Sequence, residues 1–249
     1  MKVTLSLDKT CTDDVSIVVD SLRASTTIVV AFDNFEKVIP CFSPEQAREI
    51  AKKHNGVLAG ERKGSKIEDF DIGNSPTAVK SYKTDKDTLI LTTSNGTRII
   101  EPMKSTVLIG TFINSKSVAK AAVELAENHI DVVMAGFNKD FGIDDYLAAG
   151  DILYWIEKEL NDSKDPKTKI NEYDGKVYWK ELDGLSEYAK SAVIGSRDEE
   201  LCKKYIRNCR SGKRLNYLGY SEDVEFCMKR NISTNVPIYK NGILELYKN

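Results

Sequence analysis

Between residues 16 and 160, short runs rich in β-branched residues alternate with longer segments of helical character. The runs are SIVV, KVIPCF, GVLAG, TLILTT, TVLIGT and DVVMAG, which begin at residues 16, 37, 56, 88, 106 and 131. Such alternation is typical of βαβ units, in which each crossover returns the chain to a mainly parallel sheet covered by helices. The sequence therefore predicts an α/β fold with a mainly parallel or mixed sheet and helices on both faces.

Helix signals lie between these runs. Ser43, Pro44 and Gln46 form a capping-box pattern at the start of SPEQAREIAKKH, with Ser at the N-cap, Pro at the first helical position and Gln at the third. Residues 114–128 and 142–160 carry apolar residues at helical spacing and predict two further helices.

The chain changes character after residue 160. Residues 161–175 are polar and rich in turn formers, which predicts a loop or boundary there. It would separate a phosphate- and metal-binding portion, residues 1–160, from a smaller C-terminal α/β portion, residues 176–249, packed on the first. Helices are expected around 184–195 and 198–210.

A β-hairpin is expected at the end of the chain. Asn241-Gly242 stands between the strand-like runs VPIYK and ILELY. This dipeptide is a strong hairpin signal because both residues tolerate positive φ.

Composition and charge exclude several classes of protein. The 36 Lys and Arg residues nearly balance 38 Asp and Glu residues, and no long block of one sign stands out, which argues against a general nucleic-acid binder. The first residues lack the apolar core of a signal peptide, and no apolar run approaches the roughly 20 residues that cross a bilayer, so we expect a cytoplasmic protein without a membrane partner. Five cysteines without a CxxC pair, and only two histidines, favour reduced thiols over a zinc site.

Polar residues follow the carboxyl ends of the predicted strands. Asp20, Arg23 and Ser25 follow the first, and the others lead into ERKG, SNGTR, TFIN and FNKDFGIDD, which begin at residues 61, 94, 111 and 137. Carboxyl ends of parallel strands share one edge of the sheet, where α/β folds bind ligands. We therefore expect these polar residues to form one rim.

The predicted rim mixes cations with carboxylates. Its cations and hydroxyl groups, together with backbone amides at helix starts, suit an oxyanion; they are Arg23, Arg62, Lys63, Arg98, Ser25, Thr26, Ser94 and Thr97. Its carboxylates would repel a bare anion; they are Asp20, Glu61, Asp71, Asp144 and Asp145. A hard cation such as Mg²⁺ that bridges carboxylate and phosphate oxygens accounts for both sets. The mixture therefore favours phosphoryl chemistry.

The same residues also fit structural roles. Asp20 suits the N-cap of the next helix, SNGT suits a hairpin turn, and Ser75-Pro76 suits a helix start. The acids at 144 and 145 suit the first turn of a helix whatever the function, and His54 and His129 are expected to be structural. The cysteine-phosphatase loop, the Arg-His-Gly motif, GxxxxGK[ST] and GxGxxG are all missing.

Five blocks in order, DSLRASTT, AGERKGSKIEDFDIGNSP, TTSNGT, IGTFIN and DDYLAAG, resemble the 2-phosphosulfolactate phosphatases of coenzyme M biosynthesis. The similarity spans about residues 16–150 and extends to SGKRLNYLGYSEDVEFC and the terminal hairpin, with mild departures at Ser21 and Thr111. It implies a cytoplasmic, Mg²⁺-dependent acid phosphatase on an α/β fold of its own type. The reaction it implies is hydrolysis of 2-phospho-3-sulfolactate to 3-sulfolactate and phosphate.

The resemblance carries functional residues over position by position. They are Asp20, Arg23, Ser25, Thr26, Glu61, Arg62, Asn74, Ser75, Asn95, Gly96 and Thr97. We infer roles within this rim. Catalysis is assigned to Asp20, Arg23 and Glu61, and Mg²⁺ to Asp20, Glu61 and Asp71. The phosphoryl group is assigned to Arg23, Ser25, Thr26 and the SNGT segment with Arg98 beside it, and Arg62 or Lys63 would face the sulfonate and carboxylate.

Two questions stay open at this point. Water attacks phosphorus directly, or a side chain is phosphorylated first, with Asp20 as the candidate nucleophile. The substrate is phosphosulfolactate or another small anionic phosphoester, and a non-catalytic binding module for a phosphorylated metabolite or a scaffold without a ligand are the alternatives to an enzyme. A homo-oligomer is compatible with the sequence.

Overall fold

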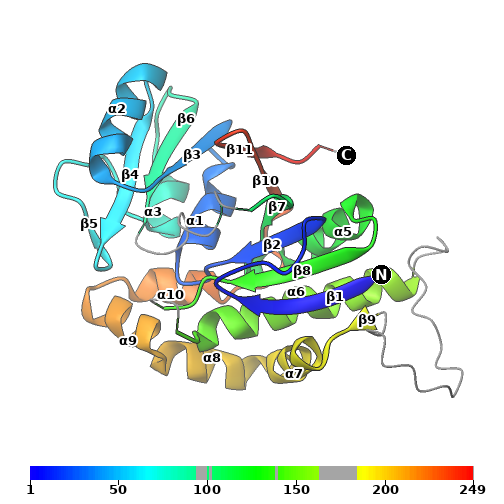
Figure 1. Ribbon diagram of the computed structural model, residues 1–249. Coiled ribbons are helices and arrows are strands. Elements are labelled where there is room, and N and C mark those ends of the chain that lie inside the picture. The colour runs from blue at the N-terminus through cyan, green and yellow to red at the C-terminus, as the bar shows by residue number, and fades with distance from the viewer. Residues whose placement is uncertain (94–99, 101–102, 138–139, 163–183, 249) are drawn as a thin grey trace, which may run out of the picture.

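The protein has an α/β fold in which helices cover a mixed β-sheet (Figure 1). The computed structural model describes residues 1–93, 100, 103–137, 140–162 and 184–248. Within these ranges eleven strands form one sheet in the order β5-β4-β6-β3-β11-β10-β7-β2-β8-β1-β9. The strands are β1 (Lys2–Leu7), β2 (Val15–Val19), β3 (Lys37–Cys41), β4 (Val57–Arg62), β5 (Ser65–Lys66), β6 (Thr88–Thr92), β7 (Thr106–Ile109), β8 (His129–Met134), β9 (Gly184–Leu185), β10 (Pro237–Lys240) and β11 (Ile243–Leu246).

The helices occupy the segments between and after these strands. They are α1 (Ala24–Ala31), α2 (Pro44–His54), α3 (Pro76–Ser81), α5 (Ser115–Leu125), α6 (Ile143–Asp162), α7 (Glu187–Ser196), α8 (Glu199–Asn208), α9 (Arg210–Tyr217) and α10 (Ser221–Cys227), with a 3₁₀ turn, η1 (Phe112–Asn114). No described helix is both long and apolar enough to cross a membrane.

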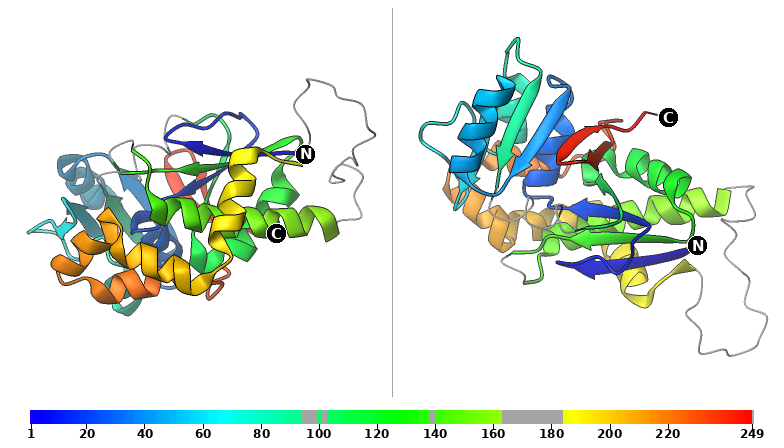
Figure 2. Two further views of the ribbon diagram at one scale, coloured as in Figure 1. Left: turned by 90° about the horizontal axis from the view of Figure 1, so that it is seen from below. Right: turned by 45° about the horizontal axis from the view of Figure 1, so that its top comes forward.

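The six predicted strands are confirmed, and the βαβ segment forms parallel pairs, among them β2 with β7 and β8, and β6 with β3 and β4. The terminal hairpin is confirmed too: Asn241 and Gly242 adopt φ of 51° and 88°. The position of the hairpin in the sheet, in contrast, is known only from the tertiary structure. The hairpin inserts between β3 and β7 and joins the two halves of the sheet, as the right-hand view of Figure 2 shows in red. The strand β1 is a further element that the sequence reasoning did not predict.

Helix starts follow the sequence signals with one difference. The Ser43 hydroxyl accepts the Gln46 N–H at 3.1 Å, as a capping box requires. The Gln46 side chain, however, accepts the N–H of Phe42, at 3.0 Å, one residue before the N-cap. Helices α7 and α8 lie where two helices were predicted, whereas α9 and α10 were not foreseen. The boundary predicted at 161–175 lies largely outside the described residues.

Strand β6 shows why the central runs are continuously apolar. Leu89 and Leu91 pack into the cluster that contains residues of α1 and α3, whereas Ile90 packs with Ala47 of α2 on the other face. Successive strand residues point to opposite faces, so a sheet covered on both sides needs apolar residues at every position. Burial of each of these three side chains contributes about 1.5–3 kcal/mol.

The half of the sheet around β8 is different, because one of its faces also buries polar residues. Ile130 and Val132 pack in the same cluster as residues of α5 and α6. On the opposite face the fully buried Asp131 accepts hydrogen bonds from the hydroxyls of Thr4 and Ser6, at 2.6 and 3.0 Å. His129 contacts the same Thr4 hydroxyl at 2.8 Å, in agreement with the structural role expected for it.

Candidate active site

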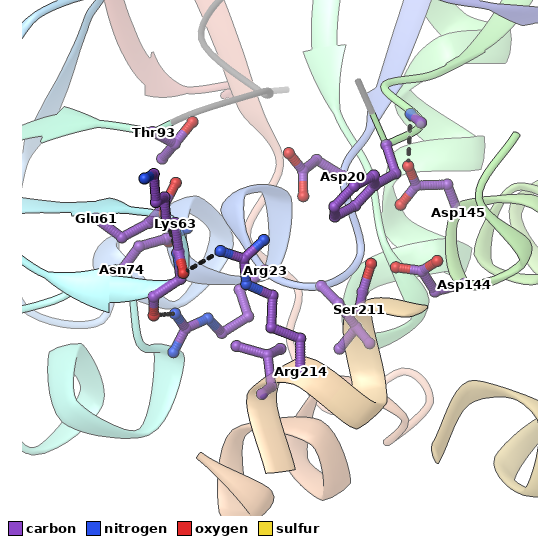
Figure 3. A pocket seen from close by; sticks show the side chains of 15 residues that line it. Asp20, Arg23, Glu61, Lys63, Asn74, Thr93, Asp144, Asp145, Ser211 and Arg214 are labelled. Atoms are coloured by element: carbon purple, nitrogen blue, oxygen red, sulfur yellow. Dashed lines mark hydrogen bonds between the residues drawn. The ribbon is translucent and has the colours of Figure 1, made fainter. Parts of the chain in front are cut away.

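One pocket of about 210 Å³ lies at the carboxyl edge of the sheet, beneath which α9 and α10 pass (Figures 1 and 3). Its lining comes from the ends of β2, β4, β6 and β8, the start of α6, and α9. The lining residues are Asp20, Leu22, Arg23, Glu61, Lys63, Gly64, Asn74, Thr93, Gly136, Phe137, Asp144, Asp145, Ser211, Arg214 and Leu215. Residues at the ends of β2, β4, β6 and β8 thus converge as the sheet-edge rule predicts, which a scaffold without a ligand does not require, whereas TFIN after β7 does not line the pocket.

One side of the pocket, here called the acidic wall, consists of Asp20, Asp144 and Asp145 (Figure 3). The pKa of Asp20 is raised to about 7, chiefly by burial and further by the charges of Asp144 and Glu61, against the lowering effects of the Ala24 N–H and Arg23. Burial likewise raises the pKa of Asp144 and, together with the charges of its two neighbours, the pKa of Asp145. The three carboxyl groups therefore disfavour one another's ionisation.

Asp20 also contacts the helix that follows it. Its Oδ1 accepts the Ala24 N–H at 3.2 Å, and its backbone carbonyl accepts the N–H of Ser25 at 2.8 Å. The N-cap position of α1 is Arg23, so the prediction that Asp20 is the N-cap residue is wrong, although its carboxylate accepts the first N–H of the helix from inside the pocket.

Asp145 joins the two loops that carry the acidic wall. Its Oδ1 accepts the Ser21 N–H at 2.7 Å, and its Oδ2 accepts the Gly136 N–H at 2.9 Å. Both acids of α6 lie in its first turn, where the helix dipole favours negative charge. Asp145 thus binds backbone amides of two other segments, whereas backbone N–H groups at the start of α6 and the side chains of Ser211 and Cys209 act on Asp144 and lower its pKa.

The cations of the pocket, here called the basic wall, are Arg23, Lys63 and Arg214. Arg23 is buried and forms an ion pair with Asp223 at 2.7 Å. Arg214 is half-buried and donates from Nη2 to the Lys63 carbonyl at 2.5 Å. Neither Arg214 nor the exposed Lys63 has a carboxylate partner among the residues that the structure describes, so both charges are available to an anion.

The turn between β4 and β5 shapes this side of the pocket. Glu61 Oε2 accepts the Gly64 N–H at 2.6 Å, and Lys63 and Gly64 adopt positive φ of 56° and 85°. Asn74 lies nearby (Figure 3), and its buried Oδ1 has no hydrogen-bond partner in the described part of the chain. An unpaired buried acceptor at a pocket wall is a position where a donor or a cation from a ligand is favourable.

Ser25 and Thr26, which were predicted to bind the phosphoryl group, are buried in the first turn of α1. The Ser25 hydroxyl accepts the Asp20 N–H at 2.8 Å. The Thr26 hydroxyl donates to the Ser21 carbonyl at 3.0 Å and meets the Thr111 hydroxyl at 3.0 Å. Much of the polarity between residues 20 and 27 therefore satisfies backbone groups of a buried turn, and neither hydroxyl lines the pocket.

Other predicted site residues also lie outside the pocket lining. Arg62 donates to the carbonyls of Glu61 and Phe42, at 2.7 and 2.9 Å, and to the Thr92 hydroxyl at 2.9 Å. Asp71 is exposed and accepts the N–H of Leu58 at 2.8 Å.

Ser75 caps α3, as its structural interpretation predicts, and accepts the Ala78 N–H at 3.2 Å. Ser94, Asn95, Gly96, Thr97 and Arg98 lie outside the described residues.

Sequence reasoning assigned no role to Ser211, Arg214 or Asp223. All three lie in SGKRLNYLGYSEDVEFC, the C-terminal block that took part in the family resemblance. That resemblance was the available signal, because nothing in the local pattern links a short C-terminal helix to residues near position 20.

The donor set of the pocket suits a hard divalent cation. Among the described residues no three His, Cys, Asp or Glu side chains are grouped to hold a metal ion by themselves. Mg²⁺, however, commonly takes only one or two protein carboxylates and completes its shell with water and substrate phosphate oxygens. Asp20 with a raised pKa, its carboxylate neighbours and the unpaired Asn74 oxygen offer that kind of incomplete oxygen site.

Comparison with known proteins gives a consistent result. A family model described as 2-phosphosulpholactate phosphatase matches residues 3–242. A 2-phosphosulfolactate phosphatase of Methanothermobacter thermautotrophicus is 42% identical over 99% of this chain and 96% of its own. Probable 2-phosphosulfolactate phosphatases of Clostridium tetani and Clostridium acetobutylicum are 35% and 33% identical, over 92% and 91% of this chain and 91% and 90% of theirs.

Proposed function

Because the chain belongs to the 2-phosphosulfolactate phosphatase family, we propose that it hydrolyses 2-phospho-3-sulfolactate to 3-sulfolactate and phosphate with the help of Mg²⁺. As a member of that family the chain is a phosphoric monoester hydrolase. Beyond this enzyme class, we propose the substrate, the dependence on Mg²⁺, a cytoplasmic location and a role in coenzyme M biosynthesis. The observation that carries it is a single pocket with an acidic wall and a basic wall.

The residues of the acidic wall would hold the Mg²⁺ ion. Asp20 would supply one ligand and Asp144 or Glu61, the carboxylates that raise its pKa, a second. A bound divalent cation would offset the mutual repulsion of these groups and neutralise phosphoryl oxygens. Asp71, which the sequence suggested as a ligand, is exposed and does not line the pocket.

Arg23 would bind the phosphoryl group. Its guanidinium lies between the acidic wall and the β4 side of the pocket (Figure 3). A planar guanidinium matches two phosphate oxygens at once, so it orients the group and stabilises charge that develops on those oxygens. The pair of Asp20 and Arg23 thus brings opposite charges to the same reacting centre.

Arg214 and Lys63 would bind the remaining anionic groups of the substrate. The proposed substrate carries a sulfonate and a carboxylate besides the phosphate, and these two cations have no carboxylate partner in the described residues. Arg62 is a weaker candidate than Lys63 for this role because its donors are occupied by two carbonyls and a hydroxyl.

The test is release of inorganic phosphate from 2-phospho-3-sulfolactate and from small phosphorylated acids that lack the sulfonate. We expect turnover with Mg²⁺, loss in excess EDTA, and recovery when MgCl₂ is restored. The Asp20→Asn variant, purified in parallel, controls for contaminating phosphatases. Full turnover in excess EDTA would contradict the metal. Binding of the substrate without phosphate release, by calorimetry, would favour a binding module, and faster release from another phosphoester would change the substrate.

A further inference from the structure

Asp223 of α10 is a buried carboxylate that joins three segments next to the pocket. Its side chain is 1% exposed. Oδ2 accepts Arg23 Nη1 at 2.7 Å, and Oδ1 accepts the Ser75 hydroxyl at 2.8 Å. The backbone N–H and the hydroxyl of Thr77 also donate to Oδ1, at 3.3 and 2.5 Å. The β2–α1 turn, the start of α3 and α10 therefore meet at one carboxylate.

Arg23 is held from two further directions. Its Nη2 donates to the Gly64 carbonyl at 2.8 Å, and its guanidinium lies 4.3 Å from the centre of the Tyr220 ring. A guanidinium has five N–H donors, of which these contacts use two. The other donors belong to a side chain that lines the pocket, and its position is set by the Gly64 carbonyl together with Asp223 and Tyr220, which do not line the pocket.

We propose that Asp223 is a positioning residue, which holds the Arg23 guanidinium in place for the phosphoryl group. The inference rests on the proposed function of Arg23. A donor that is already oriented does not have to reorganise when charge develops on the phosphoryl oxygens, and loss of this advantage lowers turnover. Because Asp223 does not line the pocket, its effect on the reaction passes through Arg23.

The rival explanation is that the Arg23–Asp223 pair only stabilises the fold. The chain contains a matched pair against which this can be judged. Asp151 is also 1% exposed, accepts Arg230 Nη1 at 2.5 Å and accepts the Ser115 hydroxyl at 2.6 Å. The Arg230 guanidinium lies 5.3 Å from the Phe112 ring centre. None of these four residues lines the pocket.

The experiment compares Asp223→Asn with Asp151→Asn in the full chain. Both variants remove the charge of a buried, arginine-paired carboxylate, so both should lower Tm. We expect Asp223→Asn to lower kcat by about 10- to 100-fold, as loss of a residue that orients a functional group does, and Asp151→Asn to keep kcat within about threefold of the wild type. Equal changes in kcat for the two variants overturn the proposal.

A double variant tests whether the effect passes through Arg23. When Arg23→Met is already present, adding Asp223→Asn should lower kcat by a further factor of less than about three, because the effects of substitutions at residues that act through one another are not additive. A full additional loss assigns Asp223 to the fold. If Arg23→Met alone keeps normal turnover, the role of Arg23 and this inference both fail, whereas phosphate release by the wild type leaves the phosphatase assignment intact.

Thr77→Val provides a second route if Asp223→Asn does not fold. The substitution keeps the shape of a half-buried side chain and removes one donor to Asp223 Oδ1. We expect a severalfold lower kcat with a small change in Tm. An unchanged kcat in folded Thr77→Val protein, together with failure of Asp223→Asn to fold, overturns the proposal in favour of a structural ion pair.

Discussion

The two walls of the pocket place charge in opposite ways. On the acidic wall three buried carboxyl groups crowd together, and burial and mutual repulsion raise their pKa values. On the basic wall Arg23 forms an ion pair with Asp223, whereas Arg214 and Lys63 have no carboxylate partner among the residues that the structure describes. In the described part of the chain the acidic wall therefore carries an excess of negative charge, and two cations of the basic wall have no counter-charge. Under the proposed function, a metal-bound phosphoester with further acidic groups would balance the charge of both walls.

The largest expected effect comes from the acidic wall. Asp20→Asn keeps an oxygen that accepts the Ala24 N–H but removes the charge proposed to hold Mg²⁺. We expect kcat to fall by about 10³-fold or more, equivalent to about 4 kcal/mol, while circular dichroism shows a folded protein.

Asp198→Asn is the matched control for that substitution. Asp198 caps α8 by accepting the Leu201 N–H at 2.9 Å and lies outside the pocket lining. Because Asn is an equally good N-cap, activity and Tm should change little. If folded Asp20→Asn protein behaves like this control, the side chain of Asp20 only supports the start of α1, and the metal has to be sought among Glu61 and the acids of α6.

The next effect concerns the basic wall and is selective. Arg214→Gln should lower kcat/KM for 2-phospho-3-sulfolactate about tenfold, or about 1.4 kcal/mol, because a charge-assisted contact to an anionic group is lost. A phosphorylated acid without the sulfonate should lose much less. The measurement is phosphate release from both substrates by the same enzyme preparation.

Lys213→Gln, an exposed neighbour on α9, controls for a general loss of positive charge and should leave both substrates nearly unaffected. The same comparison with Arg62→Gln tests whether Arg62, which the sequence suggested, contributes to sulfonate binding as Arg214 does. Equal losses on both substrates for Arg214→Gln would make this residue a structural link between α9 and the Lys63 carbonyl.

The smallest expected effect is on the pH dependence of stability. Folding raises the pKa of Asp20 from 3.8 to about 7, chiefly by burial, so the folded protein keeps this proton over a range where the unfolded chain has lost it. Stability is therefore lost as pH rises from about 4 to about 7 and stays low above that range. In EDTA, the wild-type Tm should fall by about 5 °C more than that of Asp20→Asn between about pH 5 and pH 8. Parallel Tm curves for the two proteins would show that Asp20 does not titrate in this way.

Local chemistry explains the part of the fold that could be predicted. The cap at Ser43, the turn at Asn241-Gly242 and the six strand runs depend on groups a few residues apart, and each is present in the structure. The sheet-edge rule also placed several pocket residues correctly at strand ends, among them Asp20 and Glu61. The pair of Arg23 and Asp223 spans 200 residues, and no periodicity or turn signal connects positions so far apart.

Glu61 and Arg62 show which features the sequence determines and which depend on the tertiary structure. They are consecutive residues of β4, so alternation by itself determines that their side chains leave the strand on opposite faces. Which of them lines the pocket depends on what packs against each face. The turn at Gly64 and α9 lie on the Glu61 side, whereas the Phe42 carbonyl and the Thr92 hydroxyl take up the Arg62 guanidinium. The sequence by itself determined the strands, the caps and the shared edge, because these depend on backbone geometry and near neighbours. Only the tertiary structure decided which polar side chains face the pocket, because that depends on the packing of segments distant in the chain.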